Sequence, residues 1–264
     1  MSSGSANLGL TISNLTEPNN PLPPLPLSHV TSAENFSAIV NKGSLTPLDC
    51  DVFGEPLIYF FYGGVFYRPA TKRPRKASEQ PVAFVFSPEV ASTASRFYPF
   101  DTGAMASGRF GKWSRSLAQL RAQFEVSANA SYGLVSKMVY YLFGNNRRYL
   151  SGQPDPENKK RSDPLPLLFD FYTDNLGASG VDHRQLLIEC QFKHSVSLDV
   201  KLLWVGYPKS KEREFVRLYK QWLQPTIPQK YPYKAHKARP PADIASELEG
   251  MARRDVIERY MSMP

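Results

Sequence analysis

The hydrophobic and polar positions predict short strands separated by helices. Leu57–Tyr67 is an apolar and aromatic run of strand type, and Pro81–Ser87 is the most strand-like run in the chain. The basic segment Thr71–Gln80 joins them. It could contact phosphates or form a solvated hairpin tip. Arg184–Phe192 alternates and then becomes apolar, which predicts a strand with one buried face, and Val196–Tyr207 predicts a strand pair or one bent strand.

Other segments place their apolar residues at helical spacing. The first of these helices closes at Lys42-Gly43, with a cation in the last turn and a glycine that can adopt positive φ. The 23 prolines favour loops and strands over a helical bundle. We therefore expect an α+β fold, with helices inserted into a sheet of short strands. The predicted helices are Ala33–Asn41, Lys112–Glu125, Ser131–Phe143, Ser210–Leu223 and Asp243–Tyr260, and Leu167–Tyr172 is predicted as a short strand.

Three segments lack a periodic pattern. Residues 1–27 are rich in Ser, Asn and Pro, which predicts a flexible tail that is either a spacer or a ligand for an SH3-type groove. Asn145–Pro166 is polar and charged and is predicted as a long loop. Thr226–Pro241 is predicted as a linker. We thus expect a main domain over 28–225, followed by a linker and C-terminal helix over 226–264.

Composition narrows the choice of partner and compartment. The chain has 264 residues, 42% hydrophobic residues and a net charge of +8. That charge suits a polyanion such as nucleic acid, or it serves solubility alone. No apolar run reaches the roughly 18 residues of a membrane span, and no signal-peptide pattern is visible, so we expect a cytoplasmic protein without membrane contact. Cys50 and Cys190 lie outside any CxxC or Cys/His cluster, so we expect reduced, buried thiols and no metal site.

Two polar residues stand out. Glu189 lies inside the apolar run LLIECQF, where a carboxylate is costly unless it is paired, hydrogen-bonded or open to a cleft. It could instead face solvent from an edge strand. His29 could be a structural histidine, or it could bind a ligand together with Thr31, which lies on the same face of an extended segment.

The sequence DTGA at Asp101–Ala104 is similar to the motif of aspartic proteases. Their chemistry needs two carboxylates that share one proton, and the chain contains no second motif of this type. Pro99 before the motif also argues against the central strand that such a protease needs. The small residues of 102–108 predict a loop or the wall of a site. Phosphate-binding, dinucleotide-binding, zinc-protease and serine-hydrolase signatures are absent from the sequence.

Three segments together resemble the ADP-ribosyltransferases, especially the DarT-like toxins that modify nucleic acid. His29-Val30-Thr31, the following helix and Lys42-Gly43-Ser44-Leu45 resemble the opening element of that group. Pro56–Pro69, PLIYFFYGGVFYRP, is similar to the second element. Arg184–Glu189, followed by Val196–Val205, is similar to the third element, in which a strand bears the catalytic glutamate.

This resemblance implies an ADP-ribosyltransferase-like split sheet and NAD as the substrate. Glu189 would stabilise the oxocarbenium-like cation that forms as nicotinamide leaves. The resemblance also implies contacts to the ribose from His29 and Thr31, to the nicotinamide from Tyr62 or Tyr67, and to the pyrophosphate from Arg68.

The resemblance indicates less about the molecule that accepts the ADP-ribose group than about the NAD site. The third element reads Glu-Cys-Gln and lacks the paired E/Q-x-E of arginine-modifying members, which disfavours a protein arginine. The net charge favours DNA or RNA, with a protein acceptor left open, and Asp101, Arg147 and Arg148 are the candidate acceptor residues. The expected role is a toxin or defence enzyme, as in toxin–antitoxin or phage-defence systems, with a neutralising antitoxin protein. The alternative is a non-catalytic nucleic-acid-binding or scaffold module.

Overall fold

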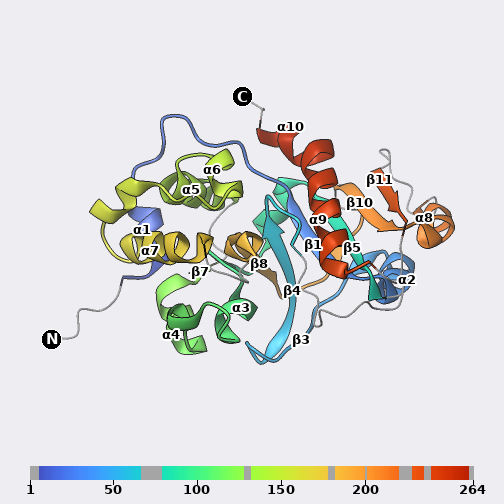
Figure 1. The fold of residues 1–264 in the computed structure, drawn as a ribbon, viewed down its shortest axis with the longest axis horizontal. Helices are drawn as coiled ribbons and strands as arrows, with labels where there is room; N and C mark the ends of the chain where they lie inside the picture. The colour runs from blue at the N-terminus through green and yellow to red at the C-terminus, as the bar shows by residue number, and fades with distance from the viewer. Residues whose placement is uncertain are drawn as a thin grey trace.

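The computed structural model describes residues 6–66, 79–127, 132–177, 182–199, 201–219, 228–234 and 239–261. One large sheet crosses this part of the chain, and all its pairings are antiparallel except that of β10 with β11. β3 (Leu48–Cys50) pairs with β4 beside this path, and β2 (Ser44–Leu45) pairs with β9 (Val196–Ser197) separately. In spatial order the strands of the large sheet are β11 (Gln229–Tyr233), β10 (Leu202–Pro208), β5 (Pro81–Phe86), β1 (Leu27–Ser32), β4 (Glu55–Tyr62), β8 (Glu189–Phe192), β6 (Arg96–Tyr98) and β7 (Val126–Ser127) (Figure 1).

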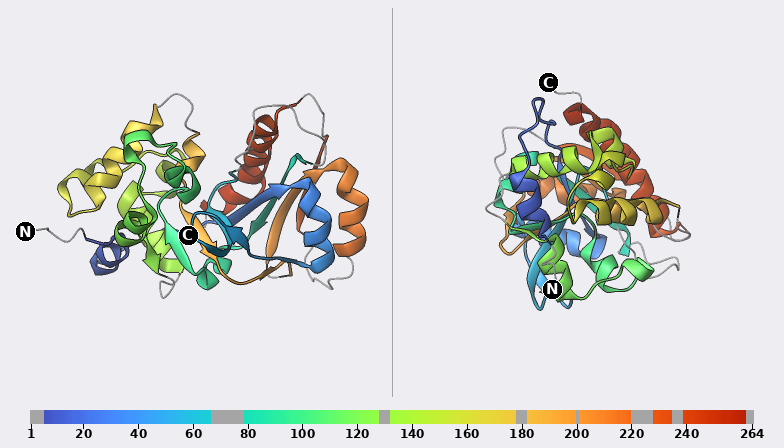
Figure 2. Two further views of the ribbon diagram at one scale, coloured as in Figure 1. Left: turned by 90° about the horizontal axis from the view of Figure 1, so that it is seen from below. Right: turned by 90° about the vertical axis from the view of Figure 1, so that its left-hand side faces the viewer.

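Helices cover the faces of the sheet and also lie beyond both of its ends. The α-helices are α1 (Leu8–Asn14), α2 (Ala33–Lys42), α3 (Thr102–Ala106), α4 (Leu117–Phe124), α5 (Tyr132–Phe143), α6 (Asn146–Leu150), α7 (Leu165–Leu176), α8 (Glu212–Tyr219), α9 (Pro241–Ala252) and α10 (Glu258–Met261). Figure 1 shows α1, α5, α6 and α7 gathered at one end of the molecule, and Figure 2 shows α2 and α8 side by side at the other. The predicted α+β fold is confirmed.

The β5 run is apolar throughout because helices cover both faces of the sheet there. Phe36 of α2 packs against Phe84 and Tyr207, with ring centroids 6.2 Å and 5.6 Å away. On the other face, a Cβ added at Gly206 would lie 2.5 Å from Cδ2 of Leu248 in α9. Gly206 and Tyr207 are neighbours in β10 and must point to opposite faces. α2 and α9 therefore sandwich this half of the sheet, and every residue of β5 is buried.

The sheet splits between β1 and β4, as the resemblance implied. These two strands pair only through Leu27↔Tyr62 and Ser28↔Phe61. Beyond Ser28, β1 continues along β5, whereas β4 continues along β8. Two neighbouring strands that part in this way open a gap lined by their side chains and by the loops that cross it.

Several predicted elements differ from the observed ones. The predicted strand Leu167–Tyr172 lies within α7, whose buried Leu165, Leu168 and Tyr172 follow helical spacing. The predicted loop Asn145–Pro166 contains α6 and the 3-10 helix η4 (Pro156–Lys160). Side chains of Asn145 and Asp155 cap these two short helices, so their stability comes from local hydrogen bonds that hydrophobic periodicity does not reveal.

Two segments outside the predicted main domain contain regular secondary structure. The segment predicted as a tail contains α1, in which Leu8 and Ile12 are fully buried. The predicted linker contains β11, which adds a parallel strand to β10. β1 lies between β4 and β5 and pairs with both, so these two strands do not form a hairpin with each other. None of the helices in the described ranges has the length and apolarity to cross a bilayer.

Candidate functional site

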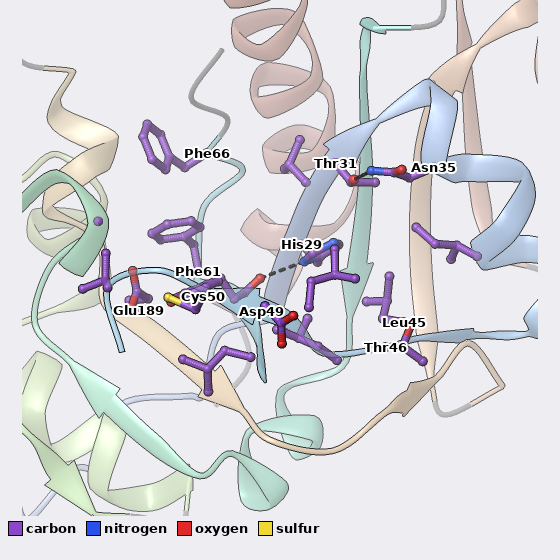
Figure 3. Close-up of a pocket in the computed structure, with 18 of the residues that line it drawn as sticks. His29, Thr31, Asn35, Leu45, Thr46, Asp49, Cys50, Phe61, Phe66 and Glu189 are labelled. Carbon is purple, nitrogen blue, oxygen red and sulfur yellow. Dashed lines mark hydrogen bonds between the residues drawn. The ribbon is translucent and has the colours of Figure 1, made fainter. Parts of the chain in front are cut away.

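A cavity of about 630 Å³ lies where β1 and β4 part. Its wall brings together His29 of β1, Asn35 of α2, Phe61 of β4, Asp101 before α3 and Glu189 of β8. Figure 3 shows Glu189 near one end of this cavity and Thr31 with Asn35 near the other, with His29, Cys50 and Phe61 between them. Pockets of a few hundred Å³ with few convergent polar groups are typical of small-molecule sites. The split of the sheet therefore forms the candidate functional site.

Glu189 is buried between strands and does not face solvent. Its strand lies between β4 and β6, so it is not an edge strand, and the side chain is 1% exposed. The backbone N–H of Thr102 donates to Oε2 at 3.0 Å, and the Thr102 hydroxyl donates to Oε1 at 2.6 Å. Nε2 of Gln191 also donates to Oε1, at 2.6 Å. Oε2 thus accepts one of these three bonds and keeps a lone pair for the cavity that Glu189 lines.

Opposing influences act on the ionisation of Glu189. Burial, followed by the neighbouring charge of Asp101, raises the pKa of Glu189 from the ordinary 4.5 to about 8. The donors of Thr102 and Gln191 act in the opposite direction because they bind the carboxylate better than the acid. The result is a buried carboxyl group that ionises near neutral pH. Perturbed carboxyl groups in clefts are candidates for catalysis.

His29 links the two strands where their backbone pairing ends. Its Nδ1 lies 2.8 Å from the carbonyl oxygen of Tyr59. A carbonyl oxygen only accepts, so Nδ1 carries the proton. Burial lowers the pKa of His29, which keeps the ring neutral and leaves Nε2 as an acceptor. Nearby, Asn35 Nδ2 donates to Thr31 Oγ1 at 2.9 Å. His29, Thr31 and Asn35 all line the cavity and give it a polar, uncharged edge.

Phe61 lines the cavity, whereas the neighbouring Tyr62 does not. Phe61 is the cross-strand partner of Glu189, so both side chains lie on one face of the sheet. Tyr62 is one residue further, points to the other face and is fully buried. Its hydroxyl accepts from the Leu25 N–H at 2.8 Å and contacts Ser136 at 3.0 Å. The structure therefore corrects the expectation for Tyr62.

Phe66 forms the second aromatic wall of the cavity. Its ring packs edge to face with Phe61, with centroids 5.0 Å apart. Neither phenylalanine is among the residues predicted from the sequence, although the alternation along β4 places Phe61 on the face of Glu189. The remaining predicted contacts, Tyr67 and Arg68, lie outside the described residues.

The candidate acceptor residues separate into two groups. Asp101 lines the cavity, and its side chain accepts from the Ala104 N–H at 2.9 Å as the cap of α3. Arg147 instead lines another hollow, beside Arg253 near the C-terminal helices. Arg148 donates to the carbonyl oxygens of Gln153 and Pro154. The structure therefore brings Asp101 to Glu189, but it does not bring the two arginines into the same cavity.

Cys50 and Tyr59 add a sulfur and a hydroxyl to the region. Cys50 lines the cavity and is half-buried, and its Sγ lies 2.6 Å from the Tyr59 hydroxyl. Cys190 is fully buried, and burial raises the pKa of its thiol. Both cysteines are free thiols. Cys190 is buried as expected, whereas Cys50 is only partly buried. Among the described residues no cluster of three His, Cys, Asp or Glu side chains could hold a metal ion.

Comparison with solved structures returns complexes of DarT from Thermus sp. 2.9. The complex with NAD+ has 14% identity and a TM-score of 0.38, covering 83% of this chain and 98% of that chain. This chain resembles DarT. The DarT complex with ADP-ribosylated ssDNA has 13% identity and a TM-score of 0.40, covering 83% and 97% of the two chains. The DarT complex with carba-NAD+ has 11% identity and a TM-score of 0.35, covering 83% and 98%.

The likeness to DarT is distant and concerns the fold alone. No protein-family model matches the chain, and no curated protein matches it.

Proposed function

We propose that this chain is an NAD-dependent ADP-ribosyltransferase that releases nicotinamide and transfers ADP-ribose to a nucleic acid. The observation that carries the proposal is the shared cavity of His29 and Glu189. A neutral acceptor and a buried, hydrogen-bonded carboxyl group face one space, although they come from strands that do not pair with each other. A structural histidine and a solvent-facing glutamate would not need to converge in this way.

Each wall of the cavity has a distinct role in the proposed reaction. Nε2 of His29 accepts a hydroxyl of ribose, and Thr31 with Asn35 supplies further uncharged polar atoms. Phe61 and Phe66 provide aromatic faces beside Glu189 for the flat, cationic nicotinamide ring. The cation lowers the pKa of Glu189 when it binds, because an opposite charge nearby favours the ionised carboxylate.

Glu189 supplies the electrostatic stabilisation of the transition state. As the bond between nicotinamide and ribose lengthens, positive charge develops on the ribose, and a fixed carboxylate lowers the barrier. Oε2 keeps a lone pair for the substrate because Oε1 is already bonded to Thr102 and Gln191. Asp101 lies in the same cavity and is placed to orient or deprotonate an acceptor group. The net charge of +8 favours a polyanionic acceptor, DNA or RNA.

Nicotinamide release from NAD by the purified protein tests the proposal. The Glu189→Gln variant is the comparison, and DNA, RNA and cell lysate are added in turn. We expect release that Glu189→Gln reduces by at least a hundredfold and that a nucleic acid accelerates. The absence of both NAD binding and release would contradict the proposal and favour a non-catalytic nucleic-acid-binding module.

A further inference from the structure

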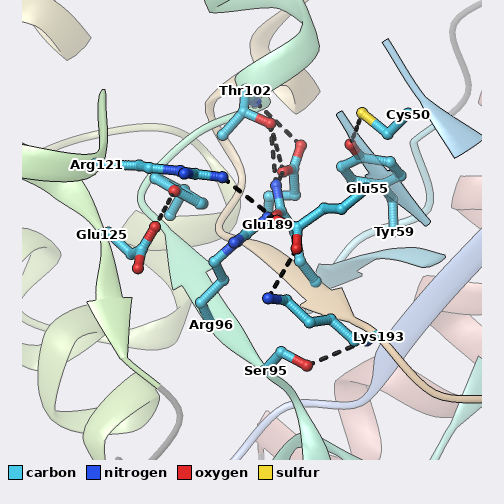
Figure 4. A network of polar contacts seen from close by, with 12 residues as sticks. Cys50, Glu55, Tyr59, Ser95, Arg96, Thr102, Arg121, Glu125, Glu189 and Lys193 are labelled. Carbon is cyan, nitrogen blue, oxygen red and sulfur yellow. Dashed lines mark hydrogen bonds and ion pairs between the residues drawn. The ribbon is translucent and has the colours of Figure 1, made fainter. Parts of the chain in front are cut away.

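Glu189 belongs to a chain of buried polar side chains that extends away from the cavity (Figure 4). Gln191 lies two residues along β8 from Glu189 and is fully buried. Its cross-strand partner is Arg96 of β6, which is 5% exposed. Nε of Arg96 donates to Oε1 of Gln191 at 2.6 Å, and Nε2 of Gln191 donates to Glu189. One amide group thus connects a buried cation to the buried carboxyl group.

Arg96 determines which way this amide points. A guanidinium group only donates, so the oxygen of Gln191 must face Arg96. The nitrogen then faces Glu189 at 2.6 Å and Thr102 Oγ1 at 3.2 Å. A reversed amide would place two donors together at Arg96 and two acceptors together at Glu189. The orientation of Gln191 therefore follows from its neighbours on both sides.

Arg96 is itself held from several directions. Its guanidinium forms an ion pair with Glu55 at 2.6 Å and lies 4.3 Å above the ring centroid of Phe53. Glu55 also pairs with Lys193 at 2.7 Å and with Arg121 at 3.4 Å. This network reaches Glu189 at Oε1 through Gln191, and its members do not line the cavity. It can therefore fix the carboxylate without occupying the space for a substrate.

We infer that Gln191, held in one orientation by Arg96, is a positioning residue that favours the carboxylate form of Glu189 and directs Oε2 into the cavity. The inference deepens the proposed function and rests on it for its catalytic meaning. Gln191 does not line the cavity, so it acts through Glu189 and does not touch the substrate.

The ionisable groups around Glu189 include Asp101 before α3, Tyr59 of β4, Cys190 of β8, and Arg96 and Tyr98 of β6. Substitution of Gln191 leaves all of these groups in the protein and removes one hydrogen bond of Arg96, which stays paired with Glu55. Methionine has a similar length to glutamine and lacks the donor. Loss of one donor to a buried anion raises its pKa, and one pKa unit is a tenfold change in the ionised fraction.

The decisive experiment is a pH titration of Glu189 by NMR in protein labelled with ¹³C at the glutamate carboxyl carbon. The Glu189 signal is assigned by its loss in Glu189→Gln. We expect Gln191→Met to raise the pKa of Glu189 by about one unit. Gln80→Met is the matched control, because Gln80 is equally buried and bonds to the Arg239 carbonyl far from Glu189, and it should leave the titration unchanged.

The rate of nicotinamide release gives the second readout. We expect Gln191→Met to lower it about tenfold at pH 7 and to approach the wild-type rate at high pH, whereas a merely structural defect would lower it at every pH. Gln191→Leu replaces Gln191→Met if the latter does not fold, because leucine is also apolar and also lacks the donor to Glu189. An unchanged titration of Glu189 in the folded variant overturns the inference. Absence of NAD turnover in the wild type contradicts only the proposed function, since the titration does not depend on activity.

Discussion

Thr102 donates twice to Glu189, from its backbone N–H at 3.0 Å and from its hydroxyl at 2.6 Å. Thr102 follows Asp101, whose side chain caps α3 and lies near the same carboxyl group. The adjacent residues Asp101 and Thr102 thus place two opposing influences beside Glu189. The charge of Asp101 opposes ionisation of Glu189, and the two donors of Thr102 favour it. This balance makes the site sensitive to single substitutions.

Thr102→Val should weaken the proposed reaction at neutral pH and spare it at high pH. Valine keeps the backbone donor and the shape of the side chain but removes the hydroxyl donor, so the pKa of Glu189 should rise. We expect roughly a tenfold loss in the rate of nicotinamide release at pH 7. Thr93→Val is the control, because the Thr93 hydroxyl bonds only to the Val90 carbonyl in a short helix. A loss that is equal at all pH values would contradict this prediction.

Asp101→Asn should have the opposite effect on the ionisation of Glu189. Asparagine still caps α3, but the negative charge beside Glu189 is gone, so the pKa of Glu189 should fall. We expect the pH profile of NAD hydrolysis to shift to lower pH. If Asp101 also deprotonates the acceptor, transfer to nucleic acid should decrease while hydrolysis does not. Full transfer activity in Asp101→Asn would exclude the role of Asp101 as a base.

The sequence predicts local features of this protein better than it predicts the contacts between distant segments. α2 and β5 are recognisable because their periodicity and capping lie within a few residues. Glu189 and His29 stand out because a charged or polar side chain interrupts an apolar pattern. α7 is not recognisable, because a short apolar run fits a buried helix as well as a strand.

The rest of the site depends on long-range pairing. Arg96 and Gln191 are 95 residues apart in sequence, and neither carries a local sign of its partner. The choice between Phe61 and Tyr62 depends on the register of β4 against β8, where a shift of one residue exchanges the two faces. Sequence periodicity does not determine that register.

The stability of the protein should depend on pH through Glu189. Its pKa in the folded state is about 8, above the ordinary 4.5, so the folded state binds more protons between these values. The free energy of unfolding should therefore fall as pH rises from about 4.5 to 8, by at most about 1.4 kcal/mol per pH unit. Glu189→Gln should remove this dependence, which denaturant unfolding at several pH values can measure. Parallel pH profiles for wild type and variant would contradict the raised pKa.

NAD should protect Cys50 from alkylation. Cys50 lines the cavity and is half-buried, whereas Cys190 is fully buried with a raised pKa. A thiol reagent such as iodoacetamide should therefore modify Cys50 in the native protein and leave Cys190 unmodified, as peptide mass spectrometry would show. Saturating NAD should slow the modification. Cys50→Ser is the control that should abolish labelling, and an unchanged rate with bound NAD would place the ligand elsewhere.

His29→Phe should impair NAD binding more than the chemical step. Phenylalanine fits beside Phe60, whose ring centroid lies 5.5 Å from that of His29, but it cannot accept a hydrogen bond from ribose. Loss of one neutral hydrogen bond corresponds to about a tenfold rise in KM, and kcat should change less because the contact also exists in the ground state. Because burial lowers the pKa of His29, the wild-type KM should not change as pH falls through 6.5.

His194→Phe is the matched control for this substitution. His194 is exposed and lies outside the cavity, so its replacement should leave KM unchanged. A loss in kcat of His29→Phe with an unchanged KM would mean that the ring holds β1 to β4 through Tyr59 and does not contact the ribose. His29→Asn would then separate the ligand contact from the structural bond. The shorter asparagine amide can accept a hydrogen bond from ribose only if β1 and β4 remain in place. Nucleotide binding measured by calorimetry on both variants decides between a ligand contact and a structural bond.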